Sequence, residues 1–334
     1  MDNFTQVICE DGAPKPCAAG GVSFIEHTSA GTRAGTSGGA TFQFDWAPPS
    51  TNAGPVTFFV AGNAANGNGA NTGDLIYTSS AVLNPVLATA PSLTGGSVVS
   101  AATSAAGPVA ANSWVSIYGT NLSATTRAWN DGDFTNGGMP FSLDGVSVIL
   151  TVFGAPRLAY VGYISPTQVN FLLPSDLSAG ALPVQVRNPA GTSTPISVTV
   201  QANAGQLLTL DGKNVAATHA NGTLAVKGGA LPGVATTPAA PGETVVLYAT
   251  GCGAVSPALT PGQVPAQAST LVTSPQVTIG GAAATVVSAT VTPGSAGLYQ
   301  IAVQVPGGAA NGDLPLTVQF GTFTAAASVL TIQK

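Results

Sequence analysis

The chain has 334 residues, of which only 6% are charged, and its formal net charge is −5 at pH 7. Typical soluble domains carry about 25% charged residues. The acidic balance excludes a phosphate-binding surface built from clustered lysine and arginine, so nucleic acid is not an expected partner. No apolar run reaches the ~18 residues that a membrane-spanning helix needs, so no membrane span is expected.

The composition favours strands and turns. Hydrophobic residues make up 45% of the chain and occur in short runs between 42 glycines and 25 prolines. Short apolar runs bounded by such breakers are typical of β-strands. The sequence therefore predicts an all-β protein with three β-sandwich domains in tandem, the last two being immunoglobulin-like repeats.

Residues 1–85 are predicted to form the first β-sandwich. Phe42, Phe44 and Trp46 alternate with polar residues, which is the period of a half-buried strand. Cys9 and Cys17 are candidates for a disulfide that closes a small loop, and two free thiols are the alternative. Cys252 is expected to be a small buried residue.

The stretch FQFDWAPPSTNAGPVTFFVAGNAANGNGANTGDLIYTSSAVL begins at Phe42 and resembles the C-terminal half of a reelin-type (Reeler) domain of bacterial surface proteins. The matching landmarks include Trp46, Asn66 and Asp74. The earlier strands of that family have no counterpart after Met1. We therefore expect an N-terminally incomplete domain, with an export signal that lies upstream or has been removed.

Residues 86–110 contain no charged residue and are rich in small ones, which predicts a linker. Residues 111–202 and 241–334 follow as two copies of one domain. Gln168 and Gln300 lie 132 residues apart, and Tyr118 and Tyr248 lie 130 apart, so the copies differ by small insertions.

Residues 203–240 are predicted to connect the two copies. Asp211 and Gly212 form a dipeptide that favours a tight hairpin turn. The connecting segment is expected to pack against one or both copies.

Residues 104–334 are similar to an uncharacterised C-terminal module of secreted bacterial proteins. The similarity rests on motifs in the same order: GTNLS from Gly119, LDGVSV from Leu143, YISPTQVNFLLP from Tyr163, PGETVVLYATGCG from Pro241 and GLYQIAVQVP from Gly297. The resemblance implies paired immunoglobulin or IPT/TIG-like sandwiches on exported proteins. It implies no catalytic residues.

No catalytic set is expected, and the chain is predicted not to be an enzyme. His27 and His219 are the only imidazoles, and both are interpreted as structural or loop residues. Residues 35–39 read G-x-S-x-G, but a nucleophile elbow needs a strand before it and a helix after it. No cofactor is expected, because no phosphate-binding loop or zinc-type cluster is present.

Asp131 and Asp133 are weak calcium candidates. With Asn130 they place oxygen ligands at alternate positions, as calcium loops do, although no glutamate closes the run. The favoured alternative is a capped turn with Trp129 and Phe134 buried.

The expected function is that of a non-catalytic, exported structural or adhesive protein of the bacterial cell surface or extracellular matrix. Its expected partners are other cell-surface proteins or copies of itself, with glycans as a further option. Two alternatives stay open. One is a subunit of an extracellular filament assembled by strand addition. The other is a carbohydrate-binding module with Trp129 or the loop at residues 61–74 as its platform.

Overall fold

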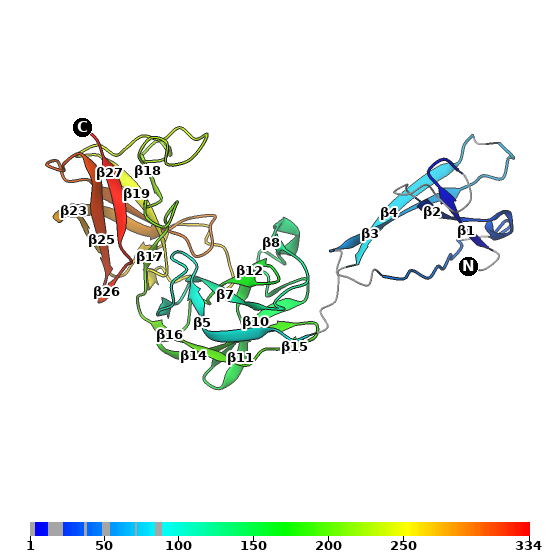
Figure 1. Cartoon of the computed structure of the whole chain (residues 1–334), viewed down its shortest axis with the longest axis horizontal. Coiled ribbons are helices and arrows are strands. Elements are labelled where there is room, and N and C mark those ends of the chain that lie inside the picture. Colours follow the sequence, from blue (N-terminus) through cyan, green and yellow to red (C-terminus); the bar gives the residue numbers. More distant parts are fainter. Residues whose placement is uncertain (1–3, 13–22, 37–38, 49–53, 71, 84–88) are drawn as a thin grey trace. The chain divides into compact units, whose positions relative to one another are not determined.

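The computed structural model describes the chain except for residues 1–3, 13–22, 37–38, 49–53, 71 and 84–88 (Figure 1). Strands dominate, and the two helical elements among the described residues are single 3-10 turns, η1 (Ser29–Gly31) and η2 (Asp131–Asp133). The predicted all-β class is therefore confirmed. The chain divides into two units, Met1–Ala53 and Gly54–Lys334.

The first unit contains one small antiparallel sheet. Strand β1 (Thr5–Cys9) pairs with β2 (Ser23–His27) along its whole length. The strand expected around Phe42 is not in any sheet of the described residues. Phe42 packs instead against the ring of His27, with ring centroids 6.3 Å apart.

The second unit begins with a hairpin. Strand β3 (Val56–Ala64) pairs with β4 (Leu75–Leu83) in unbroken register from Val56 opposite Leu83 to Ala64 opposite Leu75. Before residue 84 the described residues thus form two separate two-stranded sheets, and an N-terminal sandwich stays a prediction.

The first sandwich runs from β5 to β16. One sheet has the order β5-β7-β13-β12-β8, and the other has the order β11-β10-β14-β16-β6. Alternate residues of facing strands fill the core, with Val115, Ile117, Val148 and Phe171 fully buried. The strands are β5 (Ser92–Ser100), β6 (Val109–Ala110), β7 (Trp114–Thr120), β8 (Arg127–Ala128), β9 (Ser142–Leu143), β10 (Val146–Val152), β11 (Ala155–Leu158), β12 (Tyr160–Ile164), β13 (Gln168–Leu172), β14 (Gly180–Asn188), β15 (Gly191–Thr192) and β16 (Ile196–Gln201).

The linker predicted at residues 86–110 is wrong over its described part. β5 and β6 are the opening strands of the first sandwich, and Leu93, Val98 and Val109 belong to its core. The small uncharged residues that suggested a linker instead allow the chain to cross from one sheet edge to the other.

The second sandwich runs from β17 to β27 and forms a continuous sheet system around β19 and β24. Leu247, Tyr299, Ile301 and Phe320 are among its fully buried side chains. Its strands are β17 (Gln206–Leu207), β18 (Ala217–Thr218), β19 (Thr244–Thr250), β20 (Val255–Ser256), β21 (Thr270–Leu271), β22 (Gln276–Ile279), β23 (Ala282–Val291), β24 (Tyr299–Gln304), β25 (Gly312–Phe320), β26 (Phe323–Thr324) and β27 (Ser328–Ile332).

The two sandwiches pair their strands in the same way. Tyr118 lies opposite Gln168 in the first sandwich, and Tyr248 lies opposite Gln300 in the second. Both sandwiches also bulge at the equivalent point, beside Val161 in β12 and beside Val286 in β23. Equivalent residues therefore hold equivalent positions in the two sheets.

The connecting segment packs against the second sandwich. β17 and β18 both pair with β19, and Val215 and Ala225 are buried in the core of that sandwich. The predicted turn is present, because the Asp211 carboxylate accepts hydrogen bonds from the backbone amide of Asn214 and from its side chain. These hydrogen bonds lower the pKa of Asp211.

Candidate functional site

The two sandwiches are joined through Trp114, the first residue of β7. Its indole Nε1 donates to the carbonyl of Ala296 at 2.8 Å, and its backbone amide donates to Thr250 Oγ1 at 3.0 Å. Beside it, the Asn112 side-chain amide donates to the hydroxyl of buried Tyr299 at 3.2 Å. Buried hydrogen bonds of this kind are costly to break, so they tie the two domains together.

An apolar cluster continues this interface. Trp129 stands edge-on to Trp114 with centroids 5.3 Å apart and contacts Phe134 at 5.1 Å. Nearby, the Met139 amide donates to the Gly262 carbonyl at 2.8 Å. Trp129 is half-buried, and its ring packs against the other aromatic side chains of the cluster. The cluster contains Trp114, Trp129, Phe134, Met139, Tyr160, Leu172, Val264 and Ala296.

The turn that holds the calcium candidates is capped. Asn130 and Asp133 form a reciprocal capping box around η2, and Arg127 donates from two guanidinium nitrogens to Asp133 at 2.8 and 3.0 Å. The hydrogen bond from Arg127 lowers the pKa of Asp133. Asp131 and Asp133 remain a prediction as calcium ligands, although both Asp133 oxygens already have partners.

The described acidic, histidine and cysteine side chains form no group of three that could hold a metal ion. In the 61–74 loop, Asp74 accepts from the Asn63 side chain at 3.2 Å and from the Asn66 amide at 3.0 Å. The bond from Asn66 lowers the pKa of Asp74. Asn71 lies outside the described residues. These hydrogen bonds make the loop a self-bonded hairpin turn.

The two histidines lie in different surroundings. His27 is exposed, and its Nδ1 lies 3.1 Å from the Thr28 carbonyl. Ser37, in the G-x-S-x-G stretch, lies outside the described residues. His219 was expected to be a simple loop residue, but its side chain is only 13% exposed.

His219 lies between a carboxylate and a hydroxyl. Its Nδ1 is 2.5 Å from Glu243 Oε1, and its Nε2 is 2.9 Å from Thr237 Oγ1 and 3.1 Å from the Thr237 carbonyl. This order matches the carboxylate, imidazole and hydroxyl of a hydrolase. However, Thr237 is exposed, its amide already donates to Leu224, and the next residue is a proline with no amide hydrogen. The flanking amides therefore provide no oxyanion site, and the arrangement fastens the connecting segment.

The bonding state is known for two of the three cysteines. Cys9 is disulfide-bonded, whereas Cys17 lies outside the described residues, so their pairing stays a prediction. Cys252 is a free, buried thiol, as expected, and burial raises its pKa well above the ordinary value.

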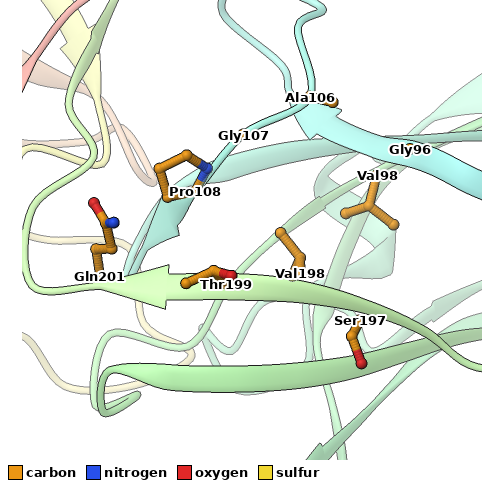
Figure 2. Close-up of a pocket in the computed structure, with 9 residues that line it drawn as sticks. All are labelled: Gly96, Val98, Ala106, Gly107, Pro108, Ser197, Val198, Thr199 and Gln201. Atoms are coloured by element: carbon orange, nitrogen blue, oxygen red, sulfur yellow. The ribbon is translucent and has the colours of Figure 1, made fainter.

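Two shallow pockets flank β5. The first has a volume of about 360 Å³ and lies between β5 and β16. Figure 2 shows Val98 and Val198 pointing into this space, with Pro108 at one side. At this pocket the gap between β5 and β16 leaves the side of the sandwich core open to solvent.

The second pocket has a volume of about 480 Å³ and lies between β5 and the end of β7. Tyr118, which is 37% exposed, is the only aromatic residue in its lining. Sequence reasoning missed this pocket because seven of its ten lining residues come from the segment interpreted as a linker. It is lined by Ser92, Thr94, Gly95, Gly96, Ser97, Val99, Ser104, Tyr118, Gly119 and Thr120.

No protein-family model matches the chain, and no curated protein matches it. Among solved structures, it is similar to SGBP-B of the Bacteroides ovatus mixed-linkage glucan utilization locus, solved with a mixed-linkage heptasaccharide. The identity is 12% over 99% of this chain and 62% of that chain, with a TM-score of 0.32. The chain thus covers less than two thirds of that protein.

Two further similarities concern surface proteins. Domains 5–6 of the S-layer protein SbsC show 13% identity over 72% of this chain and 98% of that one, with a TM-score of 0.22. The Escherichia coli adhesin FdeC shows 15% identity over 100% and 98%, with a TM-score of 0.21. Similarities this low do not indicate what the chain binds. No described helix is long and apolar enough to cross a membrane.

Proposed function

We propose that the chain is a non-catalytic, exported structural or adhesive protein of the bacterial cell surface or extracellular matrix. The observation that carries this proposal is the joined pair of immunoglobulin-like sandwiches. Trp114 and Asn112 of the first sandwich are hydrogen-bonded to Ala296, Thr250 and Tyr299 of the second. Such a pair keeps two outer surfaces at a constant orientation, which suits a protein that presents surfaces to partners.

The low charge supports the same role. With 6% charged residues, association must depend on hydroxyl, amide and apolar groups, and salt screens these only weakly. The proposed partners are other surface proteins or further copies of the chain.

Protease treatment of intact producing cells tests the location. We expect the full-length protein to be cleaved without lysis, and purified chain to adhere to untreated cells, but not to protease-treated ones, in a manner that resists added salt. Protein that is protected until the cells are lysed would contradict the proposal.

The His219 arrangement allows a direct test of the non-catalytic part. Wild type and His219→Ala are compared for hydrolysis of p-nitrophenyl acetate, and we expect both rates to equal the buffer rate. A wild-type rate that His219→Ala abolishes would show that this part of the proposal is wrong.

A filament subunit is the second candidate, and the β3–β4 hairpin favours it. Among the described residues β3 and β4 pair only with each other, and Phe59, Ile76 and Tyr77 are 84%, 64% and 63% exposed. An open strand edge with exposed apolar side chains can accept a strand of a second copy. Size-exclusion chromatography and electron microscopy at rising concentration test this, and Ile76→Lys should abolish any assembly. A monomer at all concentrations would remove this candidate.

A further inference from the structure

The second pocket is formed by an interruption in strand pairing. Leu93 pairs with Gly119 and Val98 pairs with Ile117, so residues 94–97 leave the ladder and bulge outward. Gly96 has a φ of +80°, a backbone conformation that favours glycine. The bulge opens a space of about 480 Å³ next to Tyr118. This volume lies within the range of about 300 to 1,000 Å³ that is usual for small-molecule sites.

The lining is neutral but rich in hydroxyls. None of its residues is Asp, Glu, Lys, Arg or His, and five of the ten are serine or threonine. A charged ligand would lose its hydration without gaining a counter-charge, so the pocket favours an uncharged ligand. Hydroxyl groups both donate and accept, which matches a ligand that carries many hydroxyls itself.

One hydroxyl in this wall lacks a partner. Ser97 is 8% exposed, and its Oγ has no hydrogen-bond partner. Because this oxygen is itself shielded from solvent, a ligand in the open pocket does not reach it without movement of the bulge. The hydroxyls available to a ligand are those of the exposed residues Ser92, Thr94, Ser104 and Thr120.

In the second sandwich, Tyr248 is the equivalent of Tyr118, and other residues cover it. Tyr248 is half-buried, its hydroxyl lies 3.2 Å from Thr218 Oγ1, and its backbone bonds to Leu208 and Ala216. In the first sandwich, the Tyr118 hydroxyl has no hydrogen bond to any described residue, and the side chain is 37% exposed. Polar side chains continue beside it, because Gln168 lies opposite Tyr118 and donates to Asn170 at 2.8 Å.

We propose that the pocket between the β5 bulge and Tyr118 binds a neutral saccharide. An apolar face of a sugar ring stacks on the tyrosine, and its hydroxyls bond to the serine and threonine side chains around it. The site is separate from Trp129 and from the 61–74 loop, since none of these residues lines the pocket. The proposal does not depend on the adhesive role, because protease exposure and sugar binding are measured separately.

Saturation-transfer NMR on the full chain tests the proposal. The probes are cellohexaose, mannohexaose and xylohexaose at ~10 mM, which reveals millimolar affinities, with hexagalacturonate as the anionic comparison. We expect at least one neutral probe to bind, and to bind more tightly than hexagalacturonate. Tyr118→Ala should weaken that binding about tenfold or more, since it removes the aromatic anchor.

The matched control is Phe153→Ala, because Phe153 is an exposed aromatic residue in the turn between β10 and β11, outside the pocket lining. It should leave binding unchanged. If Tyr118→Ala folds poorly, Thr94→Trp is the second variant, since Thr94 is exposed on the bulge and a large side chain there blocks the pocket. Absence of binding by every neutral probe, preference for the anionic probe, or full binding by Tyr118→Ala or Thr94→Trp would overturn the proposal.

Discussion

The two sandwiches differ in the segment that covers the outer edge of their equivalent strands, β7 and β19. In the first sandwich a single strand, β5, lies there, whereas in the second the short strands β17 and β18 do so. Each sandwich also has a parallel bridge between the segment before its first long strand and its last strand. Val109 pairs with Val200 in the first sandwich, and Ala239 pairs with Ile332 in the second. Each domain thus begins well before its first recognisable motif, in a segment that resembles a linker.

The largest expected effect tests whether these segments belong to the cores. Val98→Asp and Val215→Asp each place an unpaired charge where the side chain is at most 4% exposed. Each should lower the free energy of unfolding by at least about 3 kcal/mol in a urea titration. Thr94→Asp and Ala220→Asp, at exposed positions in the same segments, are the controls and should change it little. Equal stability of all four variants would restore the linker interpretation.

The next effect tests the junction between the sandwiches. An added Cβ at Gly297 would lie 2.9 Å from Trp114 Cδ1 and would clash with Leu172, and its φ of +65° disfavours alanine. Gly297→Ala should cost about 2 to 4 kcal/mol and split the thermal transition into two steps, as measured by calorimetry. Gly294 has a φ of +74° but open space around its Cβ, so Gly294→Ala should cost only about 1 kcal/mol. The same loss in both variants would show that backbone strain, and not interface packing, dominates.

A smaller effect concerns the segment that is particular to the second sandwich. His219→Ala removes the contacts to Glu243 and Thr237 and should cost about 1 to 2 kcal/mol, with faster hydrogen exchange across residues 219–237. His27→Ala is the matched control, because that histidine is exposed and should contribute under about 0.5 kcal/mol. Unchanged exchange in His219→Ala would contradict a fastening role.

The smallest effect belongs to the Arg127–Asp133 turn of the first sandwich. The folded pKa of Asp133 lies below its ordinary value of 3.8. Its contribution is therefore present above that ordinary value and is lost as pH falls through the folded pKa. Asp133→Asn should lower stability by under about 1 kcal/mol near pH 6, and the difference from wild type should shrink as the pH falls below 3.8 and through the folded pKa of Asp133. A difference that persists in acid would show that the charge is not its cause.

The duplication could be predicted from spacing in the sequence. The separation between Tyr118 and Gln168 is nearly the same as that between Tyr248 and Gln300, and both pairs lie opposite each other in the sheets. The opening strands were not visible. Residues 92–100 contain mainly serine, glycine and valine, and only a partner strand gives such a segment its structure.

The candidate site was hidden for a related reason. Tyr118 could be placed on a strand, but the pocket beside it depends on a bulge that only the pairing of β5 with β7 defines. The contacts of His219 were equally hidden, since Thr237 and Glu243 follow it at separations that match no motif.

The junction has an evolutionary consequence. Several of its hydrogen bonds end on main-chain carbonyls of the second sandwich, at Ala296, Gly262 and Leu259. A residue keeps its main-chain carbonyl when its side chain is replaced. Substitutions at these positions can therefore accumulate while the angle between the domains stays the same. Correlated substitutions across this junction should then be sparse, even in lineages that preserve the arrangement.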